Sequence, residues 1–180
     1  MNIYEGRPTD IAGRSEKEIA AYDMLDALGI AYKRADHEPA MTMEDCVAIG
    51  EALGAHICKN LFLCNRQKTD FYLLLMPGDK VFKTKELSSQ INSARLSFAG
   101  PEELAQYLNL TPGSATVLGL AYDKECKVRL LIDKDLLAME WFGCHPCMNT
   151  SSIAMKTKDM LEKFLPSTGH DYTEVTLVGE

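Results

Sequence analysis

The chain contains 180 residues with a mass of 20.0 kDa, a size that fits one compact domain. Hydrophobic residues make up 46% and charged residues 25%, which supplies a sizeable core and excludes wholesale disorder. The formal net charge of -7 argues against a protein that coats nucleic acid through bulk positive charge.

The chain has no fixed-period repeat, no low-complexity tract and no linker rich in proline, glycine or serine. We therefore expect a flexible N-terminal arm over residues 1–12 and a single domain over residues 13–180. No apolar run approaches the roughly 20 residues that span a bilayer, and the N-terminus lacks the layout of a signal peptide. We expect a cytoplasmic location, no membrane partner and reduced cysteines.

The first half of the chain alternates helical and extended patterns. A capping box at Ser15 and Glu18 opens a helix that runs to residue 28. After an extended segment over residues 32–35, a second helix begins at Thr42 and ends near residue 53, with core positions at Val47, Ala48 and Leu53. Two apolar runs, 61–64 and 71–76, then predict a β-hairpin whose second strand is buried on both faces.

The second half is richer in strands. We expect helices over 84–91, from 101 onward and over 157–165, and strands over 95–99, 140–142, 152–155 and 174–178. Residues 117–122 and 127–132 predict a second hairpin. Because strands outnumber the crossover helices of a parallel doubly wound sheet, the sequence predicts an α+β fold with a mixed, mostly antiparallel sheet flanked by helices.

Three segments offer groups that can take part in chemistry. Lys59 and Asn60 directly precede the strand at 61–64, so they form either a solvated strand end or an anchor for a phosphate or carbonyl oxygen. The turn that contains Gly113 and Ser114 has an ordinary explanation in turn geometry, and backbone amides in such turns also hold anionic oxygens. His145 lies in a loop between two strands, among glycine, proline and hydroxyl residues, where functional histidines are common.

The same loop contains a C-x-x-C pair, Cys144 and Cys147. A redox pair requires the first cysteine at a helix start, but this loop leads into a strand. A zinc site requires a second pair of ligands, and the other cysteines are solitary.

Six ordered segments resemble the freestanding aminoacyl-tRNA editing enzymes related to the prolyl-tRNA synthetase insertion domain and the YbaK proteins. They are Asp36-His37-Glu38-Pro39, Lys59-Asn60-Leu61-Phe62-Leu63, Leu96-Ser97-Phe98-Ala99 with Pro101-Glu102-Glu103-Leu104, Thr111-Pro112-Gly113-Ser114, Asp133-Lys134-Asp135-Leu136-Leu137, and Gly143-Cys144-His145-Pro146 with Asn149-Thr150.

The resemblance implies hydrolysis of the ester that joins alanine to proline tRNA. Such editing is needed because a pocket built for proline rejects a smaller side chain by only ~1 to 3 kcal/mol per missing methylene. The resemblance implies catalytic roles for Lys59 and His145, with a bound water as the attacking group. It also implies that the substrate is bound by Met41, Thr42, Asn60, Gly113, Ser114, Gly143 and Asn149.

The resemblance further implies no cofactor, no metal, and the acceptor end of tRNA as partner, with prolyl-tRNA synthetase as a second partner and a monomer or weak homodimer as the assembly. Helix one is expected to contact the acceptor stem through Arg14 and Lys17, and further basic residues form either a rim around Lys59 or a solvated mixed surface: Lys80, Lys83, Lys85 and Arg95. Two alternatives stay open, a non-catalytic module that binds tRNA or a synthetase, and a thiol oxidoreductase that uses Cys144 and Cys147.

Overall fold

The computed structural model describes residues 1–39 and 42–179. Its helices are α1 (Glu16–Ala27), α2 (Met43–Leu53), α3 (Thr84–Gln90), α4 (Pro101–Leu108), the 3-10 helix η1 (Val117–Tyr122), α5 (Lys134–Leu137), and a continuous run of α6 (Thr157–Asp159), the π-helical turn η2 (Met160–Phe164) and α7 (Leu165–Thr168). Its strands are β1 (Ile3–Glu5), β2 (Tyr32–Asp36), β3 (His56–Cys64), β4 (Phe71–Pro77), β5 (Ser97–Phe98), β6 (Val128–Asp133), β7 (Trp141–Cys144), β8 (Ser151–Lys156) and β9 (Tyr172–Val175).

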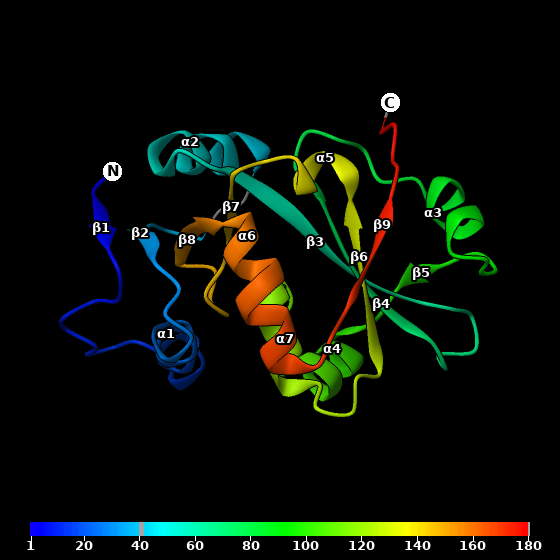
Figure 1. Cartoon of the computed structure of the whole chain (residues 1–180), viewed down its shortest axis with the longest axis horizontal. Helices are drawn as coiled ribbons and strands as arrows, with labels where there is room; N and C mark the ends of the chain where they lie inside the picture. The colour runs from blue at the N-terminus through cyan, green and yellow to red at the C-terminus, as the bar shows by residue number, and fades with distance from the viewer. Residues whose placement is uncertain (40–41, 180) are drawn as a thin grey trace.

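The strands form one mixed sheet in the order β1-β2-β8-β7-β3-β4-β6-β9, and β5 pairs with β3. The pairs β3–β7, β4–β6 and β6–β9 are parallel, and the others are antiparallel. The prediction of an α+β fold with a mostly antiparallel sheet is therefore confirmed. Figure 1 shows α2 near the β1–β2–β8 end of the sheet and α3 near β5 and β9.

Helices cover both faces of the sheet, and alternate residues of the central strand β4 pack into two different hydrophobic clusters. Phe71, Leu73 and Leu75 join the larger core with α1, α4, η1 and the α6–α7 run. The alternate residues, Tyr72, Leu74 and Met76, pack with α3 on the opposite face. Because side chains alternate along a strand, a strand that is apolar at every position has to be covered on both sides. The prediction that this strand is buried on both faces is confirmed.

Two local predictions are wrong. Residues 117–122 form the helix η1 rather than a strand, because Thr116 caps it by accepting a hydrogen bond from Leu118 N and Gly119 packs tightly against Leu108. The expected second hairpin is therefore absent within the described residues, and β6 pairs in parallel with β4 and β9.

The core face of α2 also differs from the prediction. Val47 is 56% exposed and Ala48 is exposed, whereas Ile49 and Leu53 are buried against Ala35 and Ala154 of the sheet. The capping box at Thr42 and Asp45 fixes where the helix begins, but the packing partner fixes which face turns inward.

The N-terminal segment has partners along part of its length. Ile3–Glu5 pairs with β2, and Arg7 forms an ion pair with Asp23 of α1 at 2.6 Å. The division of the chain at residue 12 stays a prediction. Over the described ranges, no helix has the length and apolar character that crossing a membrane requires.

Candidate active site

The sheet opens between β3 and β7. The two strands pair in parallel only at His56 with Phe142 and Ile57 with Gly143, after which β7 ends at Cys144. A Cβ atom on Gly143 would lie 2.4 Å from Ile57 Cδ1, so only glycine permits this approach without a shift. The sequence had indicated that Lys59 directly precedes a strand at 61–64. In the structure Lys59 lies inside β3, and the opening lies beside it.

The register places polar side chains on the face that α2 covers. Ile57 and Lys59 project to one side of β3, and Ser152 lies on the same face because Gly143 pairs with both Ile57 and Ala154. His145 follows the end of β7, and its ring lies near this face, with Nδ1 3.5 Å from Ser152 Oγ and the ring centroid 6.3 Å from that of His37. Ser152 is paired with Ala35, which packs on α2, and His37 follows two residues after Ala35. His37, Ser152 and His145 therefore form a cluster on the sheet face to which Lys59 also projects.

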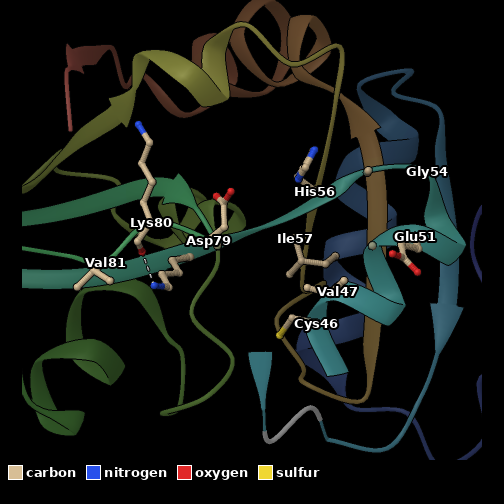
Figure 2. Close-up of a pocket in the computed structure, with 13 residues that line it drawn as sticks. Cys46, Val47, Glu51, Gly54, His56, Ile57, Asp79, Lys80 and Val81 are labelled. Carbon is tan, nitrogen blue, oxygen red and sulfur yellow. Dashed lines mark hydrogen bonds between the residues drawn. The ribbon is translucent and has the colours of Figure 1, made fainter. Parts of the chain in front are cut away.

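Lys59 lines a cavity of about 750 Å³. Its walls come from α2, from the start of β3 and from the turn after β4, and Figure 2 shows Cys46 and Val47 facing Asp79, Lys80 and Val81 across it. Within the described residues, the hydrogen bond of Lys59 Nζ goes to the carbonyl oxygen of Lys80 at 2.5 Å. The cavity combines apolar walls with an ammonium group that a ligand oxygen can take over from a backbone carbonyl.

The turn after β4, whose Lys80 carbonyl accepts the hydrogen bond from Lys59, is tied to the rest of the fold by the Lys80 side chain. Lys80 Nζ lies 2.8 Å from Asp133 Oδ2 and 2.7 Å from Asp135 Oδ2, and it donates to the carbonyl of Leu177 at 2.6 Å. Burial opposes the charge, but the hydrogen bonds to Asp133 and Asp135 raise the pKa of Lys80. Lys80 therefore acts as a structural tie whose carbonyl faces the cavity, and its ammonium is not part of a free basic rim.

Hydrogen bonds fix how His145 presents its ring. Its Nδ1 lies 2.9 Å from the carbonyl oxygen of Ser151, so this nitrogen carries the proton and Nε2 is the acceptor. Among the described residues, no hydrogen bond reaches Nε2. Ser152 Oγ lies 3.5 Å from His145 Nδ1 and 2.8 Å from His37 Nε2, which links the two rings. Burial lowers the pKa of His145 below 6.5, although the bond to Ser151 opposes this, so the ring is neutral at pH 7.

Asn60 projects to the opposite face from Lys59. Its Nδ2 donates to the carbonyl oxygen of Cys58 at 3.3 Å, and its buried Oδ1 has no partner among the described residues. A buried amide oxygen without a donor is costly, so Asn60 offers an unused acceptor beside the opening in the sheet.

The two predicted glycine bends meet each other. Gly113 has a φ of +89°, as its turn requires, and a Cβ atom there would lie 3.6 Å from Asn149 Nδ2. Ser114 is buried and donates to the carbonyl oxygen of Thr111 at 2.8 Å, so its hydroxyl is used within the turn. Of the described residues that line the Lys59 cavity, none belongs to either bend.

The remaining predicted substrate residues lie near the start of α2. Thr42 is its N-cap and exchanges hydrogen bonds with Asp45, so its hydroxyl has a structural role. Met41 lies outside the described residues. Sequence reasoning missed Cys46 and Gly50, which line the cavity one turn apart on α2, and it gave no role to Ser152. The helical spacing of Cys46 and Gly50 was a signal, but their face depends on packing.

The thiol pair lacks the features of a redox site. Cys144 and Cys147 are each 2% exposed. Burial raises the pKa of both thiols, to about 12 for Cys147, whereas an oxidoreductase needs a lowered thiolate pKa. In the described part of the chain, no cluster of three or more His, Cys, Asp and Glu side chains has the arrangement of a metal site.

Arg14, expected to contact the acceptor stem, is held within the protein. Its guanidinium lies 2.7 Å from Glu18 Oε2 and 2.9 Å from Asp36 Oδ2. Burial opposes ionisation of Asp36, but hydrogen bonds from Arg14, Arg34 and Ser151 lower its pKa. The guanidinium therefore fastens α1 to the end of β2, and the prediction of stem contacts through Arg14 loses its support.

The chain is similar in sequence to known proteins. The family model described as "Aminoacyl-tRNA editing domain" matches residues 37–163. The chain is 31% identical to the "Prolyl-tRNA editing protein ProX" of Acetoanaerobium sticklandii, over 85% of this chain and 93% of that protein. It is 30% identical to the "Prolyl-tRNA synthetase associated domain-containing protein 1" of Xenopus laevis, over 89% and 96%.

A solved structure shares the fold. The crystal structure of a protein proposed as a trans-editing enzyme for prolyl tRNA synthetase superposes with a TM-score of 0.66 at 17% identity, covering 91% of this chain and 98% of that one.

Proposed function

Because the chain belongs to the aminoacyl-tRNA editing domain family, we propose that it is a trans-editing deacylase that removes alanine from mischarged proline tRNA. The observation that carries the proposal is the ammonium of Lys59 in an apolar cavity, on the sheet face near which His145 lies. The relatives' names, which mention prolyl-tRNA editing and prolyl-tRNA synthetase, support proline tRNA as the substrate and the synthetase as a partner. We also propose that residues 13–180 form the editing domain.

The proposed reaction is an ester hydrolysis. The oxygen of a water molecule bonds to the ester carbonyl carbon, and the bond from that carbon to the ribose oxygen breaks. The ribose oxygen takes up a proton that the water gives up. The products are free alanine and a tRNA with its terminal hydroxyl restored.

Lys59 is the proposed electrostatic catalyst. Its ammonium exchanges the Lys80 carbonyl for the negative oxygen that develops on the ester, or for the neighbouring phosphate. A charge in a sheltered cavity interacts far more strongly than one in water. No acid–base role is assigned to Lys59.

His145 is the proposed acceptor for the attacking water. Its Nδ1 proton is committed to the Ser151 carbonyl, so Nε2 has the lone pair that can receive a hydrogen bond from water. Ser152 and His37 act as positioning residues, because they fix the plane and the protonated nitrogen of the ring without reaching the ester.

Selection for alanine is proposed to come from α2. Cys46 and Val47 face the turn after β4 across the cavity, and Gly50 lets the helix lie close to β3, since a Cβ there would be 2.6 Å from the Ala55 carbonyl. If the amino acid side chain of the substrate lies against Cys46 and Val47, a larger ring overlaps them, and overpacking costs typically about 1–3 kcal/mol. A proline ester is therefore expected to react more slowly than an alanine ester.

The test is deacylation of alanyl-tRNA and prolyl-tRNA forms of proline tRNA. Wild-type protein is expected to release alanine faster than proline, and Lys59→Ala to lower the alanine rate by about 10²- to 10³-fold. The matched control is Lys124→Ala, which removes an exposed lysine from a turn far along the sequence. Unchanged activity of Lys59→Ala would refute the assigned site. Binding of tRNA with no turnover of any ester would favour the non-catalytic module.

A further inference from the structure

Phe98 and Phe82 form an aromatic pair on the sheet face of the Lys59 cavity, and the ring of Phe98 is exposed. Phe98 on β5 is 63% exposed, and its ring lies 5.8 Å from that of Phe82 in an edge-to-face arrangement with an interplanar angle of 65°. An edge-to-face pair leaves ring surface uncovered. An exposed aromatic on an edge strand carries a risk of aggregation, so its presence needs a reason.

The pair lies on the same side of the sheet as Lys59. Phe98 is directly opposite Leu63 of β3, and Lys59 precedes Leu63 by four residues, so all three project to one face. The distance along the strand is roughly 13 Å at 3.3 Å per residue. Val81, which is 55% exposed and lines the cavity, directly precedes Phe82 in the chain. The aromatic pair therefore lies on the same side of the sheet as the cavity, and the chain segment that lines the cavity leads directly into Phe82.

Exposed basic residues lie in the two segments that carry the pair, in a protein whose net charge is -7. Lys83 and Lys85, at the start of α3, are exposed, and so is Arg95 before β5. The two segments are joined because Thr84 Oγ1 donates to the carbonyl oxygen of Leu96 at 3.1 Å. Exposed aromatics with neighbouring cations are the pattern of surfaces that bind single-stranded nucleic acid, where bases stack and cations meet phosphates.

We propose that Phe98, supported by Phe82, is a stacking platform for the base of an unpaired nucleotide at the 3′ end of the tRNA, whose phosphates meet Lys83 and Lys85. The identity of this ligand rests on the proposed function. The platform holds the strand so that its terminal ester enters the Lys59 cavity past Val81. Sequence-tolerant stacking suits this position, because an acceptor end offers unpaired bases to any partner.

The test measures binding of uncharged proline tRNA, with and without its three 3′-terminal nucleotides. Phe98→Ala is expected to weaken binding of the intact tRNA by about 5- to 150-fold, the effect of removing one stacked base. Phe98→Trp should restore it. The truncated tRNA should bind wild type and Phe98→Ala equally. Replacing Lys83 and Lys85 by alanine should reduce the salt slope of log K by about 0.7 for each phosphate that is no longer neutralised.

The matched control is Tyr172→Ala, which removes an aromatic ring that is 41% exposed on β9. Equal binding of intact tRNA by Phe98→Ala and wild type would overturn the platform, and so would an equal weakening on intact and truncated tRNA. Weaker binding of a synthetase with unchanged tRNA binding would also overturn it. The Phe98-dependent binding requires no ester, because the tRNA in this assay is uncharged. If no ester is hydrolysed but that binding persists, the proposed function fails and the platform stands.

Discussion

The close approach of Gly143 to Ile57 predicts that substitutions at these two residues have coupled effects on stability. A methyl group in Gly143→Ala would lie 2.4 Å from Ile57 Cδ1, about 1 Å inside ordinary contact. Because Cδ1 is the end of a flexible side chain that can turn away, we expect a cost toward the lower end of the about 1–3 kcal/mol that overpacking typically causes. Ile57→Val removes the obstructing Cδ1 atom and alone costs about 0.5–1.5 kcal/mol. The double variant should therefore be about as stable as Ile57→Val, because the added methyl occupies the vacated space.

Urea unfolding of the wild type, both single variants and the double variant measures this coupling. Trp141, the single tryptophan of the chain, packs in the same cluster as Ile57 and reports unfolding by fluorescence, with circular dichroism as an independent probe. The expected interaction free energy is about 1–2 kcal/mol, within the range for residues in contact. Strictly additive effects would refute the packing explanation of Gly143.

Deacylation by the same four proteins separates packing from substrate binding. If the glycine serves only the approach of β3 to β7, the double variant should regain the activity of Ile57→Val. If stability returns but hydrolysis does not, the substrate itself needs the bare backbone at Gly143, as the family resemblance implies.

Three further predictions concern charge, pH and thiols. Lys80→Met should lower the free energy of unfolding by about 3–5 kcal/mol, because it leaves the carboxylate of Asp133, which is 0% exposed, as a buried charge without a cation. The control Asp135→Asn should lower it by less than about 1 kcal/mol, because Asp135 is half exposed. As the pH falls, the deacylation rate should decrease with a midpoint below pH 6.5, because burial lowers the pKa of His145 and a proton on Nε2 removes its lone pair. A midpoint above pH 6.5 would contradict the role assigned to His145. A thiol reagent should react fastest with exposed Cys126 in the native protein, and Cys126→Ser should remove that fast phase. A fast phase that persists would mean that half-buried Cys46 or a buried thiol reacts as fast as an exposed one.

Local signals in the sequence were sufficient for many elements. The N-cap residues Ser15 and Thr42 marked the starts of α1 and α2, and Pro101 marked the start of α4. These features work over three or four residues and do not depend on the rest of the fold. The apolar run 71–76 likewise indicated a strand buried on both faces, as β4 is.

Predictions failed where one apolar run suited two structures. Residues 117–122 are apolar on every side, and periodicity cannot distinguish a buried strand from a buried helix of that length. The contacts of Gly119 with Leu108 and Leu110 decide for a helix. In the same way, the sequence pattern of α2 did not determine which face of the helix turns inward. The packing of Ile49 against the sheet decides it.

The sequence by itself determined the starts of α1, α2 and α4, the central hairpin, the fold class, and the segments that carry Lys59 and His145. The tertiary structure alone decided that these two side chains lie near one face of the sheet, that Asn60 points away from them, and that Phe98 lies exposed on the side of the sheet that holds the cavity. The physical reason is that parallel pairing of β3 with β7 joins residues more than 80 positions apart, and one residue of register reverses every side chain. No local pattern encodes that register, because the two strands come from distant parts of the chain and meet only in the folded protein.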